Sequence, residues 1–267
     1  MSQARWFPPL LAVSLAVALS FLTLPIVAIF VDTGPADLVS SLDDPAAIDA
    51  LTLSLWTSTV ALVIIVLVGT PAAYLLATRR FRARNLIITL IELPLVLPPA
   101  VAGIGLLAAL GPNGLFGQAL DDAGIRVVLT TVSVILALTF VAAPFYLRQA
   151  EAAFSALDRS WLDASRTLGA GEATTFVHVA IPAALPGLIA GLALAWGRAL
   201  GEFGATLMFA GPFRGVTQTV PLAIYERFAT DFTAALALSA VLVAVSAAIL
   251  MTVKLATHAS PARVLTR

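Results

Sequence analysis

The chain has 267 residues, of which 60% are hydrophobic and only 11% charged, with a formal net charge of zero and no cysteine. A soluble domain carries about 25% charged residues, so these charges cannot cover a water-facing surface, and lipid must replace water over much of it. The balanced charge gives no basic field for nucleic acid, and the lack of cysteine excludes disulfides, thiolate metal sites and cysteine nucleophiles.

Six apolar stretches predict six transmembrane helices, which we place near residues 7–31, 52–77, 86–110, 127–147, 179–210 and 232–256. Each is long enough to cross a bilayer, which takes about 20 residues, and such continuous runs indicate helices rather than the short alternating segments of a barrel. The first run exceeds the apolar region of a signal peptide, about 7–15 residues, so we expect an uncleaved span. The sequence predicts an all-α membrane protein with a single transmembrane domain over 1–267.

The arginines alternate with the spans. Connections 78–85 and 148–178 are rich in arginine, whereas connection 32–51 holds five aspartates and neither lysine nor arginine. The chain ends carry further positive residues, namely Arg5, Lys254, Arg263 and Arg267. Because positive residues stay on the cytoplasmic side, we predict a multi-pass protein of a bacterial inner membrane, with both termini and 148–178 cytoplasmic and with 32–51 and 211–231 facing outward.

The third apolar stretch is interrupted by Pro94, Pro98 and Pro99. Proline removes a backbone donor and kinks a helix. The stretch is therefore either a bent packing helix or a kink that lines a pathway.

No catalytic or metal-binding set emerges from the sequence. His178 and His258 are the only histidines and lie in different segments, outside any metal-ligand spacing. The single lysine, Lys254, lies outside any phosphate-binding loop of the G-x-x-x-x-G-K-[ST] type. We expect no enzymatic activity, metal or cofactor in this chain, and if ATP drives it, ATP must bind a partner subunit.

The connection 148–178 predicts two helices separated by glycine. Four apolar residues recur on one helix face, at Leu157, Trp161, Ala164 and Leu168. Gly169 and Gly171 then end the helix, since glycine readily adopts the positive φ of a helix C-terminus, and a second helix begins near Glu172. This helix–glycine–helix unit either binds a partner or is an interfacial helix that caps the bundle.

The same connection resembles the E-A-A-x3-G-x9-I-x-L-P loop of permease subunits of bacterial ABC importers. The matching residues are Asp163-Ala164-Ser165, then Gly169 after three residues, and Val179-x-Ile181-Pro182 after nine more. A literal Glu151-Ala152-Ala153 occurs earlier, but it places Leu157 where the loop has glycine, so we set it aside. The resemblance implies that this loop inserts into a cleft of the ATPase subunit, with Asp163, Ala164, Ser165, Leu168 and Gly169 as the coupling residues.

Further segments are similar to molybdate and sulfate permeases, namely 93–99, 166–170, 198–206 and 219–225. The resemblance implies a type I ABC importer permease fold. It also implies transport of a tetrahedral oxyanion, molybdate or tungstate, delivered by an external binding protein. Its partners would be an ATPase subunit and a second permease copy, in a homodimer. The alternatives are a sulfate or thiosulfate permease and, in another class, a membrane scaffold protein without transport activity.

Three ionisable residues fall inside the predicted spans. Arg198 and Glu202 are four residues apart and are therefore neighbours on one helix face. Ionisable residues in a membrane usually face the bundle interior or a wet cavity, so this is either a structural ion pair or a pathway element. Glu92 in the third span is a candidate second partner for Arg198. Two carboxylates around one arginine would repel an oxyanion, so we do not expect this group to bind the substrate.

Overall fold

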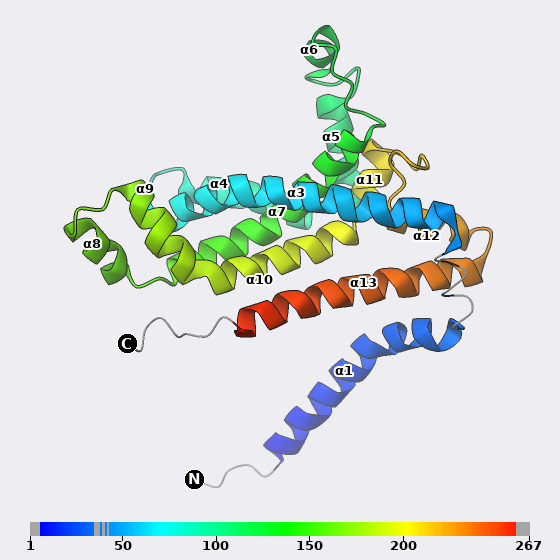
Figure 1. The fold of residues 1–267 in the computed structure, drawn as a ribbon, viewed down its shortest axis with the longest axis horizontal. Coiled ribbons are helices and arrows are strands. Elements are labelled where there is room, and N and C mark those ends of the chain that lie inside the picture. The colour runs from blue at the N-terminus through cyan, green and yellow to red at the C-terminus, as the bar shows by residue number, and fades with distance from the viewer. Residues whose placement is uncertain (1–5, 35–37, 39–40, 42, 260–267) are drawn as a thin grey trace.

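The computed structural model describes residues 6–34, 38, 41 and 43–259, and over these ranges the chain is helical with no β-strand (Figure 1). This confirms the all-α fold class. Arg5, Arg263 and Arg267, which contribute to the predicted orientation, lie outside the described residues, as do both chain ends.

The helices follow one another in the order α1 (Phe7–Asp32), α3 (Pro45–Thr78), α4 (Arg84–Val96), α5 (Pro99–Leu110), α6 (Gly117–Asp122), α7 (Thr131–Ser155), α8 (Arg159–Thr167), α9 (Glu172–Thr175), the π-helical turn η1 (Phe176–Ala180), α10 (Ile181–Leu200), α11 (Gly204–Phe209), α12 (Val220–Phe228) and α13 (Phe232–Ala259). Helices satisfy their own backbone hydrogen bonds, which is what lets an apolar chain cross lipid.

The centre of the molecule is a bundle of α3, α7 and α10, with α7 packed against both neighbours. Small residues let the helices approach closely, because a Cβ added to Gly187 of α10 would lie 2.5 Å from Ala153 Cβ of α7. The buried hydroxyls of Thr70 and Tyr146 join α3 to α7 by a 2.7 Å hydrogen bond. This bundle is the scaffold on which the other elements are mounted.

Among the described residues, five helical segments are long and apolar enough to cross a membrane, namely Phe7–Asp32, Pro45–Thr78, Thr131–Ser155, Glu172–Leu200 and Phe232–Val253, and the bent pair α4 and α5 would add a sixth. The predicted third span, 86–110, is interrupted at its prolines, as expected, and the break is sharp: α4 ends at Val96, α5 begins at Pro99, and the two meet at an angle of 116°. Pro98 and Pro99 provide no backbone N–H, and a residue before proline is forced out of the helical conformation. Leu97 accordingly has an extended backbone, with φ −67° and ψ 131°.

The predicted fifth span, 179–210, is also interrupted. Helix α10 ends at Leu200, and residues 201–203 lead into the short helix α11. Two of the six predicted spans therefore contain a break, and both breaks fall at Gly or Pro residues.

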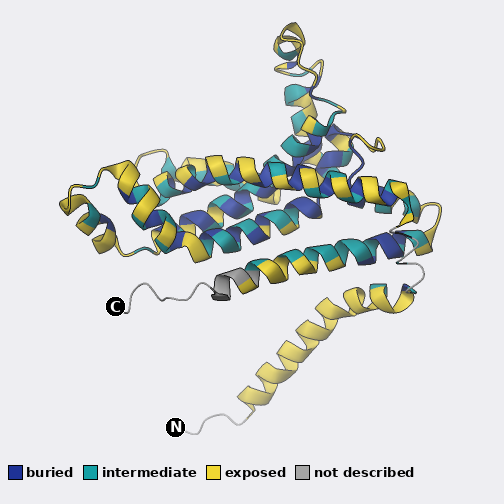
Figure 2. Ribbon diagram, in the orientation of Figure 1, coloured by how far each residue is buried: buried dark blue, intermediate teal, exposed yellow. Residues whose placement is uncertain are grey.

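The two ends of the bundle carry different elements. Helices α8 and α9 lie at one end, α11 and α12 lie toward the other, and α5 leads away from the bundle with α6 at its tip (Figure 1). Helix α1 contacts α13, yet none of its residues is buried and nearly all of them are exposed (Figure 2).

Candidate functional site

Helix α8 in the connection 148–178 has a defined start and end. The Ser160 N–H donates to Asp158 Oδ1 at 2.9 Å, which caps the helix and holds the pKa of the Asp158 carboxyl below its usual range. Gly169 follows the helix with φ +87°, as predicted from the Gly169–Gly171 pattern. The predicted helix–glycine–helix unit is therefore present, with α9 beginning at Glu172.

The apolar residues of α8 point in two directions. Leu162 is buried and belongs to the bundle core, and Leu157 packs against that core. Trp161, Ala164 and Leu168 are exposed, and Leu168 keeps 89% of its surface accessible. Only three of the four residues in the predicted stripe thus form an outward surface, because Leu157 and Leu162 attach the unit to the bundle. We call Trp161, Ala164 and Leu168 the α8 outer face.

Polar contacts hold the two short helices together and onto the bundle. The hydroxyls of Ser165 and Thr175 lie 3.0 Å apart, which joins α8 to the last residue of α9. Glu172 of α9 forms an ion pair with Arg79 at the end of α3. Asp163 is exposed, and among the described residues its carboxylate pairs with Arg166, one turn away, at 3.5 Å. Its carboxylate is therefore accessible from outside the chain.

The predicted ion pair of the fifth span is present. Arg198 Nη2 lies 2.6 Å from Glu202 Oε2, and the Glu202 side chain is fully buried. This contact is not aligned as a hydrogen bond, so Oε2 has no hydrogen-bond partner among the described residues. The other carboxylate oxygen, Oε1, accepts the Ala205 N–H at 2.7 Å. Glu202 therefore joins the end of α10 to the first turn of α11 across the break.

The breaks of the third and fifth spans pack against each other. A Cβ added to Gly204 of α11 would lie 2.8 Å from Pro99 Cβ, and one added to Gly103 of α5 would lie 2.7 Å from the Ala205 carbonyl oxygen. The two irregular segments are therefore in close contact beside the buried Glu202. Pro98-Pro99 and Gly201–Gly204 each interrupt an apolar run in the sequence. No local spacing predicts that these two interruptions lie against each other.

Glu92 does not pair with Arg198, and that prediction is wrong. Its Oε1 lies 2.8 Å from Nε of Arg148 on α7. Arg148 also forms an ion pair with Glu151, which is buried. Glu151 forms a second ion pair with Arg84, at 2.8 Å. The Glu151-Ala152-Ala153 lookalike thus begins with a residue that holds α4 onto α7.

No group of three or more histidine, aspartate or glutamate residues that could hold a metal ion occurs in the part of the chain that the structure describes. Glu92 and Glu151 are instead paired with arginines across the contact of α4 with α7, and Glu202 is paired with Arg198 at the end of α10. These arrangements can hold helix ends in place and can present a surface to a partner.

Comparison with known proteins agrees with this architecture. The sequence profile described as "Binding-protein-dependent transport system inner membrane component" matches residues 69–259. The molybdenum transport system permease protein ModB of Mycobacterium tuberculosis is 42% identical over 231 residues, which covers 86% of this chain and 88% of that protein. The sulfate transport system permease protein CysT of Salmonella typhimurium is 34% identical over 211 residues, 79% of this chain and 76% of that protein.

Among solved structures, a bacterial ABC transporter involved in the import of the acidic polysaccharide alginate has a similar fold, with a TM-score of 0.72 and 16% sequence identity over 98% of this chain and 96% of that chain. At that identity the likeness concerns the fold, which is that of an ABC importer permease. The profile match spans most of the chain, and the ModB relative exceeds 40% identity. The chain therefore belongs to the family of binding-protein-dependent transport system inner membrane components.

Proposed function

We propose that this chain is the transmembrane subunit of an ATP-driven importer of a tetrahedral oxyanion, with molybdate or tungstate as the substrate. The observation that carries the proposal is the 42% identity to the molybdenum permease ModB over 86% of the chain. The sulfate permease CysT, at 34% identity over 79% of the chain, supports sulfate or thiosulfate as the second candidate.

Substrate competition separates the two candidates. The permease is co-expressed with its ATPase and binding protein and reconstituted in liposomes, and lumenal molybdenum is measured by mass spectrometry after ATP is added. We expect uptake that excess tungstate abolishes and excess sulfate leaves unchanged. Sulfate uptake that excess molybdate does not inhibit would identify the chain as a sulfate permease instead.

The ATPase is proposed to bind the α8 outer face. Trp161, Ala164 and Leu168 are exposed. Asp163 beside them is exposed as well, and Arg166 contacts only its Oδ1 atom among the described residues. Aromatic and aliphatic residues next to a charge are suited to anchor a partner in a cleft. Leu162, in the core, and Glu172, paired with Arg79, would pass movement of the bound ATPase to the bundle.

A second copy of the chain is proposed as the other membrane partner, in a homodimer. Helix α1 is apolar and has no buried residue, and α5 diverges from α4 by 116° with exposed Val101 and Ile104. The external binding protein would deliver the anion at the α12 end of the bundle. The Arg198–Glu202 pair carries no net charge, so we place substrate specificity in that binding protein and not in this pair.

The proposed topology places α8 and α9 in the cytoplasm and α6 and α12 outside, with both chain ends cytoplasmic. The native chain has no cysteine, so single-cysteine labelling has no background. We expect an impermeant maleimide to label Asp122→Cys in intact spheroplasts and to label Ala173→Cys only after lysis; both positions are exposed. The reverse pattern would invert the topology.

A further inference from the structure

A basic cavity lies where α3 ends and α4 begins. Its volume is about 400 Å³, and five arginines line it, namely Arg79, Arg80, Arg82, Arg84 and Arg159. Four of them come from the short α3–α4 connection and the start of α4, and the fifth is the first residue of α8. The cavity therefore joins two segments that are far apart in the sequence.

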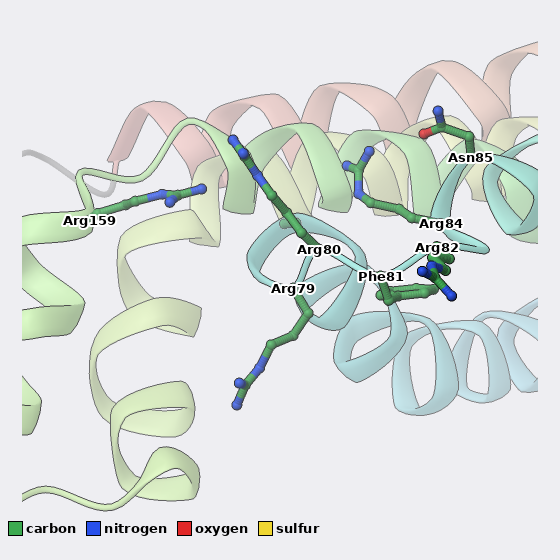
Figure 3. Close-up of a pocket in the computed structure, with 8 residues that line it drawn as sticks. Arg79, Arg80, Phe81, Arg82, Arg84, Asn85 and Arg159 are labelled. Atoms are coloured by element: carbon green, nitrogen blue, oxygen red, sulfur yellow. The ribbon is translucent and has the colours of Figure 1, made fainter.

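Two of these arginines are already neutralised. Arg79 forms an ion pair with Glu172, and Arg84 contacts Glu151 and the Leu76 carbonyl oxygen. The Arg79 side chain points away from that of Arg80 (Figure 3). Arg80, Arg82 and Arg159 have no carboxylate partner among the described residues, and the side chains of Arg80 and Arg159 point toward each other (Figure 3). The Arg82 side chain lies beside Phe81 and points away from these two (Figure 3). Two like charges that face each other without a counter-ion repel one another, so an anion between Arg80 and Arg159 stabilises them.

The cavity adjoins apolar surface. Helices α3 and α4, which this connection joins, are mostly apolar. Phe81 of the connection is exposed, and so are Leu86 and Leu90 along α4. An anion at this level therefore lies at the boundary between hydrocarbon and water. Basic pockets at the end of membrane helices suit anionic lipid head groups, and exposed leucines running away from the pocket suit acyl chains.

We propose that Arg80 and Arg159 bind the phosphodiester of an anionic phospholipid such as phosphatidylglycerol. The planar guanidinium group pairs with two phosphate oxygens at once, and the cavity volume falls within the range of about 300–1,000 Å³ that accommodates small-molecule ligands. Because Arg159 begins α8, the bound lipid ties this helix to the α3–α4 connection. The site is separate from the α8 outer face and does not depend on which anion is transported.

Lipid retention by the full-length protein tests the proposal. Protein purified in detergent is delipidated, incubated with equal amounts of phosphatidylglycerol and phosphatidylcholine, repurified, and analysed for bound lipid by mass spectrometry. Each arginine near a lipid surface contributes about fivefold in affinity. We expect Arg80→Gln with Arg159→Gln to lower the preference for phosphatidylglycerol by about 25-fold, and Arg159→Gln alone by about fivefold.

A matched control removes the same net charge elsewhere. Arg126 and Arg214 are exposed and lie in connections away from the α8 end of the bundle, so Arg126→Gln with Arg214→Gln should retain the wild-type preference. Arg80 and Arg159 make no internal ion pair among the described residues, and gel filtration confirms that the variants are folded.

Three results would overturn the lipid assignment. The first is an unchanged phosphatidylglycerol preference in the Arg80/Arg159 double variant. The second is that inorganic phosphate binds the delipidated protein through the same arginines while no lipid preference exists, which makes the ligand a free anion. The third is that the ATPase subunit displaces the lipid, which makes the cavity a contact for an acidic protein surface.

Discussion

Gly169→Val is expected to insert into the membrane at wild-type levels and to lose the ATPase subunit. Gly169 has φ +87°, a conformation that costs an L-residue about 1–2 kcal/mol and a β-branched residue more. The chain can relieve this strain only by rotating out of the left-handed region, which moves α9 relative to α8. The measurement is co-purification of the ATPase with tagged permease, beside the membrane level of the permease, and molybdate uptake should fall in parallel.

Gly171→Val is the matched control for this variant. Neither glycine has a heavy atom within 4 Å of the position where a Cβ would be placed, so the added side chain meets the same open space at both sites. Gly171 has φ −68° and ψ 166°, which valine adopts freely. Gly171→Val should therefore keep the ATPase, and equal loss of the ATPase from both variants would show that bulk and not backbone conformation is responsible.

Ala164→Trp and Asp163→Lys test the surface instead of the turn. Both residues are exposed, so the changes leave the packing of this chain intact. In a closely packed cleft, overpacking costs about 1–3 kcal/mol, which corresponds to roughly 5- to 150-fold weaker ATPase binding. If both variants, together with Gly169→Val, retain the ATPase and still stimulate its hydrolysis when substrate is delivered, α8 is only an interfacial cap of the bundle.

The features that could be predicted from the sequence are those set by short-range geometry. Arg198 and Glu202 meet because residues four apart on a helix are neighbours whatever surrounds them. Gly169 takes a positive φ because only glycine does so without strain at the end of a helix. Apolar runs of about 20 residues likewise identify spans, since the length is fixed by bilayer thickness.

The features that could not be predicted depend on which helices pack together. Glu92 pairs with Arg148 because α4 lies along α7, and no local spacing relates residues so far apart. Proline signalled a kink in the third span, but not a turn of 116° that brings α5 against α11. Glu151 resembles part of a loop motif, and only the packing of α4 against α7, which buries it 2.8 Å from Arg84, shows that it is an ion-pair partner of that arginine.

Arg198→Met is expected to give the largest loss of folded protein among the substitutions within the spans. Glu202 is fully buried, and Arg198 is the only cation within ion-pair distance of its carboxylate among the described residues. Removing one member of a buried ion pair leaves an uncompensated charge, at a cost of about 3–5 kcal/mol. The measurement is the yield of monodisperse permease after detergent extraction, together with its thermal unfolding midpoint.

The double variant Arg198→Met with Glu202→Gln should recover most of that loss. The glutamine carbonyl still accepts the Ala205 N–H that Glu202 Oε1 accepts at 2.7 Å, and no buried charge remains. Arg198→Met with Glu202→Ala is the informative comparison, because it also removes the charge but leaves the Ala205 N–H without its acceptor, which costs about 1–3 kcal/mol. We therefore expect stability to decrease in the order wild type, the Gln double variant, the Ala double variant, and then Arg198→Met alone.

Equal stability of Arg198→Met and the Gln double variant would mean that the Glu202 carboxylate is neutral or solvated in the membrane. If the Gln double variant is folded and still transports, the ion pair only holds α10 to α11. If it is folded but inactive, the charge itself takes part in movement of the two packed breaks.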